Sequence, residues 1–158
     1  MMQKRRWLAR NRRHPEPARP DLQAPTGAWL SGFPWDWFTT MTFAAPIHPE
    51  QAARRWARWV RHVEKEEGHT IRWARALEYQ KRGVIHYHAL TWGMLDARRL
   101  TYMDAWEEIG DGFARILPYD PQRGAGFYLG KYVSKGGEID LGGKWWQPTP
   151  WARAHAGA

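Results

Sequence analysis

Cysteine is absent from the 158 residues of the sequence. Its absence excludes a disulfide framework, a thiolate zinc site and a cysteine nucleophile. Long apolar runs are absent too, since no window approaches the roughly 18 uninterrupted apolar residues that span a membrane. The phosphate-binding motif G-x-x-x-x-G-K-[ST] is also missing: Glu138 stands in place of its first glycine, and Trp145 follows Gly143-Lys144. We therefore expect a soluble, single-domain protein without a nucleotide-hydrolysing motor.

Acidic residues are scarce in the first 20 residues, so the positive charge is uneven along the chain. The sequence has 24 Lys and Arg against 16 Asp and Glu, a formal charge of +8, of which residues 1–20 hold +6. Four prolines break up the first 26 residues, which show no apolar periodicity. We predict an arm over residues 1–26 and a folded domain over residues 27–158. Such an arm suits phosphate backbones or an anionic membrane surface, and the alternative is a solvated tail without a partner.

Hydrophobic periodicity predicts the elements of the folded domain. Alternating β-branched and aromatic residues indicate strands, while apolar residues at three- and four-residue steps indicate helices. The predicted elements are a strand at Phe38–Phe43, a helix at Pro49–Glu67, strands at Thr70–Tyr79 and Val84–Trp92, a helix capped by Asp96 and ending near Ile109, a strand at Phe113–Leu117, and a helix at about Ala125–Lys135. This order predicts an α+β domain with a central antiparallel β-sheet and helices packed against it. We expect most of the 12 tryptophans in its core.

Two histidines, His86 and His88, flank Tyr87 in the second strand of the predicted hairpin. Because side chains alternate across a strand, both imidazoles project from one face. Glu78 lies near the end of the partner strand, close enough to add a carboxylate oxygen. Two neutral imidazoles and one carboxylate make a three-ligand site with open positions for Mn²⁺, Mg²⁺ or Zn²⁺. The alternative is that the histidines are partly buried polar residues without a ligand.

Two tyrosines lie on the last predicted helix. Tyr128 and Tyr132 are four residues apart and share a helix face, as do Lys131 and Lys135 on a neighbouring face. Taken alone, this pattern also fits an amphipathic helix that directs two aromatic residues toward the core.

Together, these motifs resemble the rolling-circle replication initiators of the HUH endonuclease superfamily. Phe38–Phe43 resembles the first strand of that family. Gly83–Leu90 is similar to its metal motif, in which two histidines flank a bulky residue after a turn glycine. Tyr128–Tyr132 is similar to its nucleophile motif, in which a lysine follows the tyrosine at the third position and a second tyrosine at the fourth. The resemblance covers residues 38–146 and implies a ferredoxin-like, RRM-like α+β fold.

The resemblance also implies a role for each candidate residue. The implied metal ligands are His86, His88 and the acidic third ligand Glu78, which would hold Mn²⁺ or Mg²⁺ in preference to Zn²⁺. Tyr128 is the implied nucleophile, because a lysine sits three residues after it. Lys131 is implied to contact phosphate or to assist the tyrosine, and Tyr132 is the second tyrosine, either catalytic or supporting.

The implied activity is metal-dependent, single-strand-specific nicking and joining of DNA, which initiates rolling-circle replication through a covalent 5′-phosphotyrosine link. The implied partners are single-stranded DNA at a replication origin and a helicase and polymerase of the host, in the cytoplasm of a bacterial or archaeal cell, with no membrane. Three alternatives remain open from the residues alone. They are a relaxase or single-strand transposase of the same superfamily, a non-catalytic module that binds single-stranded nucleic acid, and a zinc hydrolase that uses bound water.

Overall fold

The computed structural model describes residues 23–95, 98–133 and 137–143 of the chain. Its helices and strands alternate along the sequence in the order that the hydrophobic pattern predicts, with one additional element at each end. The elements are α2 (Gln23–Ser31), β1 (Trp37–Thr42), α3 (Pro49–Glu67), β2 (Arg72–Tyr79), β3 (Ile85–Trp92), α4 (Arg99–Gly110), β4 (Ala114–Pro118), α5 (Ala125–Val133) and β5 (Ile139–Gly142). The predicted α+β class is confirmed.

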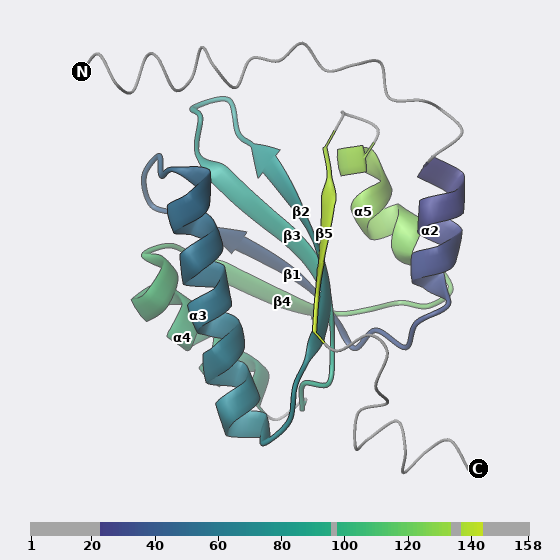
Figure 1. Ribbon diagram of the computed structural model, residues 1–158, viewed down its shortest axis with the longest axis horizontal. Coiled ribbons are helices and arrows are strands. Elements are labelled where there is room, and N and C mark those ends of the chain that lie inside the picture. The colour runs from purple at the N-terminus through teal and green to yellow at the C-terminus, as the bar shows by residue number, and fades with distance from the viewer. Residues whose placement is uncertain (1–22, 96–97, 134–136, 144–158) are drawn as a thin grey trace.

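The five strands form one antiparallel sheet in the order β4-β1-β3-β2-β5. Figure 1 shows α3 and α4 on one face of this sheet and α2 with α5 on the other. The strand β3 lies in the middle, paired with β1 on one side and β2 on the other. Every side chain of β3 therefore faces one of two helical layers.

Alternation along β3 separates the apolar residues from the two histidines. Ile85, Tyr87 and Ala89 are buried in the core beneath α3 and α4. His86 and His88 take the opposite face, which α5 covers. The β2–β3 turn is closed by a hydrogen bond from the backbone N–H of Gly83, with φ at 73°, to the carbonyl of Gln80 at 2.8 Å. This turn fixes the register that the site requires.

The helix α3 begins and ends at residues that suit those positions. The Nδ1 of His48 accepts a hydrogen bond from the backbone N–H of Glu50 at 3.3 Å, and Pro49 follows as the first helical residue. Gly68 ends the helix at a φ of 74°, in the left-handed region that favours glycine. The buried stripe of α3 consists of Ala52, Trp56, Trp59, Val60 and Val63. The helix is thus anchored along its length.

Tryptophan supplies much of the core, as predicted. The buried tryptophans of the described residues are Trp35, Trp37, Trp56, Trp59, Trp92 and Trp106. Trp56 packs against Trp59 with ring centroids 5.2 Å apart, and Trp59 donates a hydrogen bond from its indole nitrogen to the carbonyl of Tyr102 at 2.9 Å. Trp29 is an exception, since half of its surface is exposed.

Some elements differ from the sequence prediction. No helix was expected before residue 27, yet α2 begins at Gln23, inside the predicted arm; residues 1–22 lie outside the described part of the chain. The short strand β5 was not predicted either. The expected cap Asp96 lies outside the described residues, and α4 begins after Arg98, whose side chain makes no capping hydrogen bond. None of the helices in the described ranges has the length and apolar content needed to cross a bilayer.

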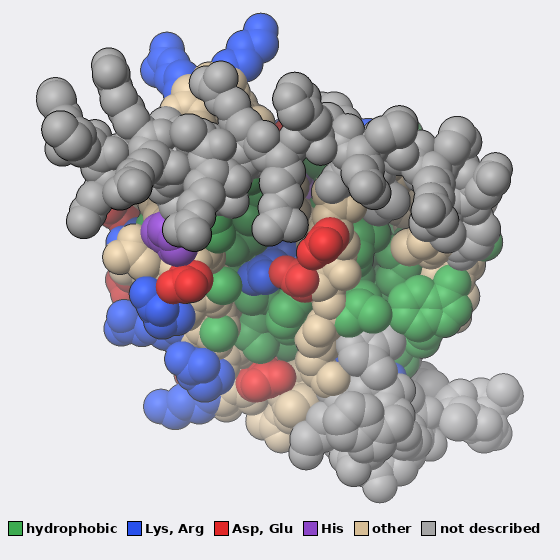
Figure 2. Space-filling model, turned by 45° about the horizontal axis from the view of Figure 1, so that its top comes forward, with side chains coloured by type: hydrophobic (Ala, Val, Ile, Leu, Met, Phe, Trp, Pro, Cys, Tyr) green, Lys and Arg blue, Asp and Glu red, His purple; other side chains and the backbone are tan. Residues whose placement is uncertain are grey.

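The outward faces of α3 and α4 carry opposite charges. The exposed charged residues of α3 include Arg54, Arg58, Arg61 and Lys65, and those of α4 are Asp104, Glu107 and Glu108. Figure 2 shows Lys and Arg side chains gathered on the side of the molecule where α3 lies in Figure 1.

Candidate metal centre and tyrosine helix

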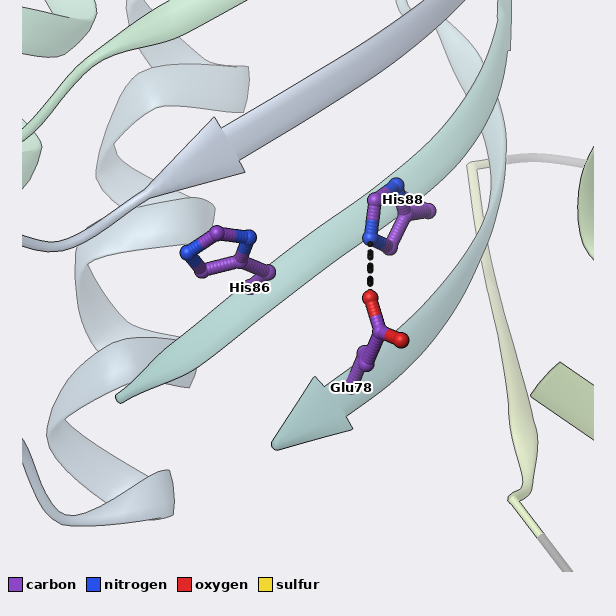
Figure 3. A group of neighbouring side chains, drawn as sticks. All are labelled: Glu78, His86 and His88. Carbon is purple, nitrogen blue, oxygen red and sulfur yellow. Dashed lines mark hydrogen bonds and ion pairs between the residues drawn. The ribbon is translucent and has the colours of Figure 1, made fainter. Parts of the chain in front are cut away.

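Glu78, His86 and His88 come together on the face of the sheet that α5 covers. Each of the three offers a ligand atom, and these atoms all lie within 4.8 Å of one another. The register explains the approach, because Glu78 and His86 are directly paired across β2 and β3. Figure 3 shows the carboxylate of Glu78 reaching from β2 toward the ring of His88 on the neighbouring strand. The hairpin prediction therefore brought the intended three side chains together.

His88 is held in its neutral form. Its Nε2 lies 3.0 Å from the Oε2 of Glu78, which is also an ion-pair distance. Burial nevertheless lowers the pKa of His88 to about 4, an effect that outweighs the opposing influence of Glu78. The contact is therefore a hydrogen bond from a neutral imidazole to a carboxylate near pH 7. Neutral imidazole is the form that binds a metal ion.

Thr40 on β1 gives His88 a second polar contact. It is paired directly with His88 in the sheet, and its hydroxyl oxygen lies 3.3 Å from Nδ1 of the ring. When Nε2 donates to Glu78, the hydroxyl of Thr40 donates to Nδ1. If Nε2 instead bound a metal ion, Nδ1 would carry the proton and the same hydroxyl would accept it. Thr40 can thus hold the ring in either tautomer.

Gln80 plays a comparable part beside His86. Its side-chain Nε2 lies 3.1 Å from Nδ1 of His86, and burial lowers the pKa of this histidine as well. Sequence reasoning identified neither Thr40 nor Gln80. Gln80 could have been found, since it lies two residues after Glu78 at the start of the turn. Thr40 could not, because the pairing of β1 with β3 has no local signal in the sequence.

Tyr132 of α5 lies directly on the cluster. Its ring stacks on the imidazole of His88, with centroids 4.3 Å apart and planes 12° apart. Small side chains beneath α5, such as Ala74 and Ala76 of β2, allow this close approach. Burial, and to a lesser degree the charge of Glu78, raises the pKa of Tyr132. Its buried hydroxyl has no hydrogen-bond partner within the described residues.

Tyr128 is one turn away and less buried. Its hydroxyl accepts a hydrogen bond from the backbone N–H of Asp120 at 2.9 Å, and its ring packs 4.9 Å from that of Phe38. Lys131, between the two tyrosines, places its ammonium 4.7 Å from the ring centroid of Tyr132. Its positive charge also contributes to the lowered pKa of His88. The structure thus places all the predicted residues of the tyrosine motif from Tyr128 to Tyr132 above the histidine-bearing face.

The donor set fits a divalent cation. Two imidazole nitrogens and one carboxylate oxygen leave further coordination positions open, and such a mixture of donors suits Mn²⁺ and Zn²⁺ and, less well, Mg²⁺. The orphaned hydroxyl of Tyr132 adds an unsatisfied oxygen on the same side of the sheet.

The antiparallel sheet, the paired histidines on its central strand and the tyrosine helix above them define the class of Rep-type replication initiators. A family model described as Replication-associated protein, of the ORF2 type, matches residues 36–137, and the chain belongs to this family. The match includes the metal-ligand cluster and both tyrosines. No curated protein and no solved structure matches the chain.

Proposed function

We propose that this protein nicks and rejoins single-stranded DNA in a metal-dependent reaction that initiates rolling-circle replication. One observation carries the proposal: three potential ligands of a divalent cation lie beneath a helix with two tyrosines in a chain of a replication-associated family. In this proposal, His86, His88 and Glu78 hold Mn²⁺ or Mg²⁺. A divalent ion bound there would supply Lewis-acid polarisation of a phosphodiester.

The covalent step uses a tyrosine of α5. The phenolic oxygen attacks the phosphorus, the bond from phosphorus to the 3′ oxygen breaks, and the leaving oxygen takes up a proton. The products are a 5′-phosphotyrosine and a free 3′-hydroxyl. One phosphodiester is exchanged for another, so the reverse reaction rejoins DNA without ATP.

Tyr128 is our proposed nucleophile, with Tyr132 in a supporting role. The structure supports this division because Tyr128 is partly exposed, whereas Tyr132 is buried with a raised pKa. A buried phenol with a raised pKa is a weak nucleophile near pH 7. Lys131 lies on the same helix, where its positive charge would interact with phosphate.

The substrate reaches the site from the side of β1 and β4. The helix α5 packs against β2 and β3, which leaves the neighbouring strands of this face open (Figure 1). Arg115 of β4 is exposed there and paired with Thr40, and Leu117 is partly exposed on the same face. We propose that a single strand from a replication origin crosses this open surface, and that a host helicase and polymerase act with the protein in the cytoplasm.

The test is an incubation with Mn²⁺ and a pool of labelled single-stranded oligonucleotides, followed by a denaturing gel. We expect a labelled band at the mass of the protein, which Tyr128→Phe abolishes and the matched control Tyr79→Phe retains. The double variant His86→Ala/His88→Ala is expected to lose cleavage.

Loss of the adduct only in Tyr132→Phe would keep the function and reverse the choice of nucleophile. Tight binding with no adduct in any protein, across a pool broad enough to contain the nick site, would instead identify a non-catalytic binding module.

A further inference from the structure

We propose that the outer face of α3 is a separate binding surface for the phosphate backbone of duplex DNA. The surface consists of Arg54, Arg58, Arg61 and Lys65, here called the α3 stripe. It lies on the opposite side of the sheet from the Glu78, His86 and His88 cluster (Figure 1). This inference goes beyond the proposed nicking reaction and does not depend on it.

The α3 stripe is a continuous line of positive charge. Its members follow one another at steps of four, three and four residues, so they lie on one side of the helix. With 3.6 residues per turn, this line points directly away from the stripe of buried residues that contains Trp56 and Trp59. All four side chains are exposed. Figure 2 shows the resulting accumulation of Lys and Arg side chains on this part of the surface.

The positive charge of the α3 stripe is not neutralised by neighbouring carboxylates. Among the described residues, no carboxylate lies within ion-pair distance of any of its four members. Two acidic residues near the end of α3 are turned elsewhere: Glu64 accepts a hydrogen bond from the N–H of Ile71, and Glu67 accepts one from the N–H of Leu95. Like charges spaced by three or four residues destabilise a helix. A surface that accumulates them fits a polyanionic partner, which would relieve the repulsion.

Duplex DNA fits this surface better than a single strand or a membrane. Surfaces for single strands combine cations with aromatic side chains that stack on bases, but both tryptophans of α3 are buried. A helix that enters a lipid interface needs a free apolar face, and that of α3 is buried against the sheet. A rigid line of cations about 16 Å long runs beside about five phosphates of one duplex strand. The exposed acidic residues of α4 would keep the duplex on the far side of α3.

The first experiment measures binding of a blunt 20-base-pair duplex by fluorescence anisotropy, in chelator, between 50 and 200 mM salt. The test variant is Arg58→Gln/Arg61→Gln, and the matched control Lys81→Gln/Arg82→Gln removes two exposed charges from the β2–β3 turn. We expect the test variant to weaken binding about tenfold at 50 mM salt and to lower the slope of log K against log salt by up to about 1.8. The control is expected to change binding less than twofold. Equal effects in the two variants, or none in the test variant, would overturn the proposal.

A cross-linking experiment keeps the proposal testable if a charge variant folds poorly, and the absence of native cysteine makes it clean. A photo-cross-linker on Gln51→Cys, beside the α3 stripe, is expected to attach to the duplex, while one on Glu108→Cys of α4 is not. Duplex binding without attachment at residue 51 would overturn the assignment. So would loss of binding to phosphatidylglycerol vesicles in Arg58→Gln/Arg61→Gln with duplex binding intact. Cleavage of single strands, if present, is expected to be unchanged by that variant, which separates this proposal from the nicking reaction.

Discussion

The imidazole of His88 contacts three side chains of different chemistry. Its ring stacks on Tyr132, its Nε2 contacts the carboxylate of Glu78, and its Nδ1 contacts the hydroxyl of Thr40. These contacts fix the orientation of the ring without a bound ion. A preorganised ligand loses less conformational entropy when the metal binds.

The hydroxyl of Thr40 is expected to strengthen metal binding. Thr40→Val keeps the shape of the side chain but leaves Nδ1 of His88 without a polar partner, so we expect Mn²⁺ affinity to fall about tenfold by isothermal titration calorimetry. Thr40→Ser retains a hydroxyl and is expected to bind Mn²⁺ within about threefold of the parent chain. Equal affinity of the Val and Ser variants would show that the hydroxyl has no such role.

Burial of His88 makes stability depend on pH in the metal-free protein. The unfolded chain takes up a proton as the pH falls through about 6.5, but the folded chain does so only near a pKa of about 4. The free energy of unfolding is therefore expected to fall between pH 6.5 and 4, by up to about 3 kcal/mol from this residue, and to level off below. Urea denaturation in chelator measures it. Other groups titrate in this range, so the comparison is with His88→Gln, whose curve is expected to be flatter.

Sequence reasoning found the cluster because its geometry is local. Alternation places His86 and His88 on one face of a strand, and a short turn brings Glu78 opposite His86. The stacking of Tyr132 on His88 and the position of Thr40 depend on contacts between distant segments. Such contacts follow from the assembled sheet and its covering helix, which no local pattern specifies.

The helix α5 is stabilised by its packing more than by its composition. It contains two glycines, Gly126 and Gly130, among nine residues. Gly126 lies against Gly27 of α2, where the absence of side chains lets the two helices approach closely. Gly130 has no such neighbour, since a Cβ there would meet nothing within 4 Å.

The two glycine positions are therefore expected to respond differently to alanine. Gly130→Ala adds helix propensity without a clash, so the free energy of unfolding is expected to rise by about 0.5–1 kcal/mol in chemical denaturation. Gly27→Ala would place a Cβ 3.1 Å from the Cα of Gly126, and we expect the contact to cancel that gain or reverse it. A larger stabilisation from Gly27→Ala than from Gly130→Ala would contradict this account of the α2–α5 contact.

Elements with a strong period were predicted, and elements held by distant contacts were missed. The helix α3 has a buried stripe, a proline at its start and a glycine at its end. By contrast, α2 has little amphipathic pattern and exposes Trp29, while β5 has four residues at the edge of the sheet. Pairing with β2 and packing against α5 stabilise these two elements, and neither contact can be read from their own residues.

At the scale of the whole molecule, the sheet separates the candidate metal site from the main hydrophobic core. The tryptophan-rich core lies beneath α3 and α4, while the cluster lies on the α5 side. The fold therefore does not require an ion, but an ion bound to the folded state would stabilise it.

Mn²⁺ at about one hundred times its dissociation constant is expected to stabilise the protein by about 2.7 kcal/mol. For a domain of this size, that corresponds to a rise of about 5–10 °C in the melting temperature, and a chelator is expected to reverse it. Differential scanning calorimetry checks the prediction, with Glu78→Gln as the isosteric control that loses most of the rise. A rise of equal size in Glu78→Gln would remove this carboxylate from the ligand set.

The two-faced character of β3 also limits how such a chain can change its length during evolution. Deleting or inserting one residue within β3 would exchange its faces beyond that point, turning imidazoles toward Trp56 and aromatic residues toward α5. A change of two residues would preserve the alternation but move the histidines away from Glu78. Length variation is therefore tolerated at the outer strand β4 and in the loops, while the central hairpin must keep both its parity and its register.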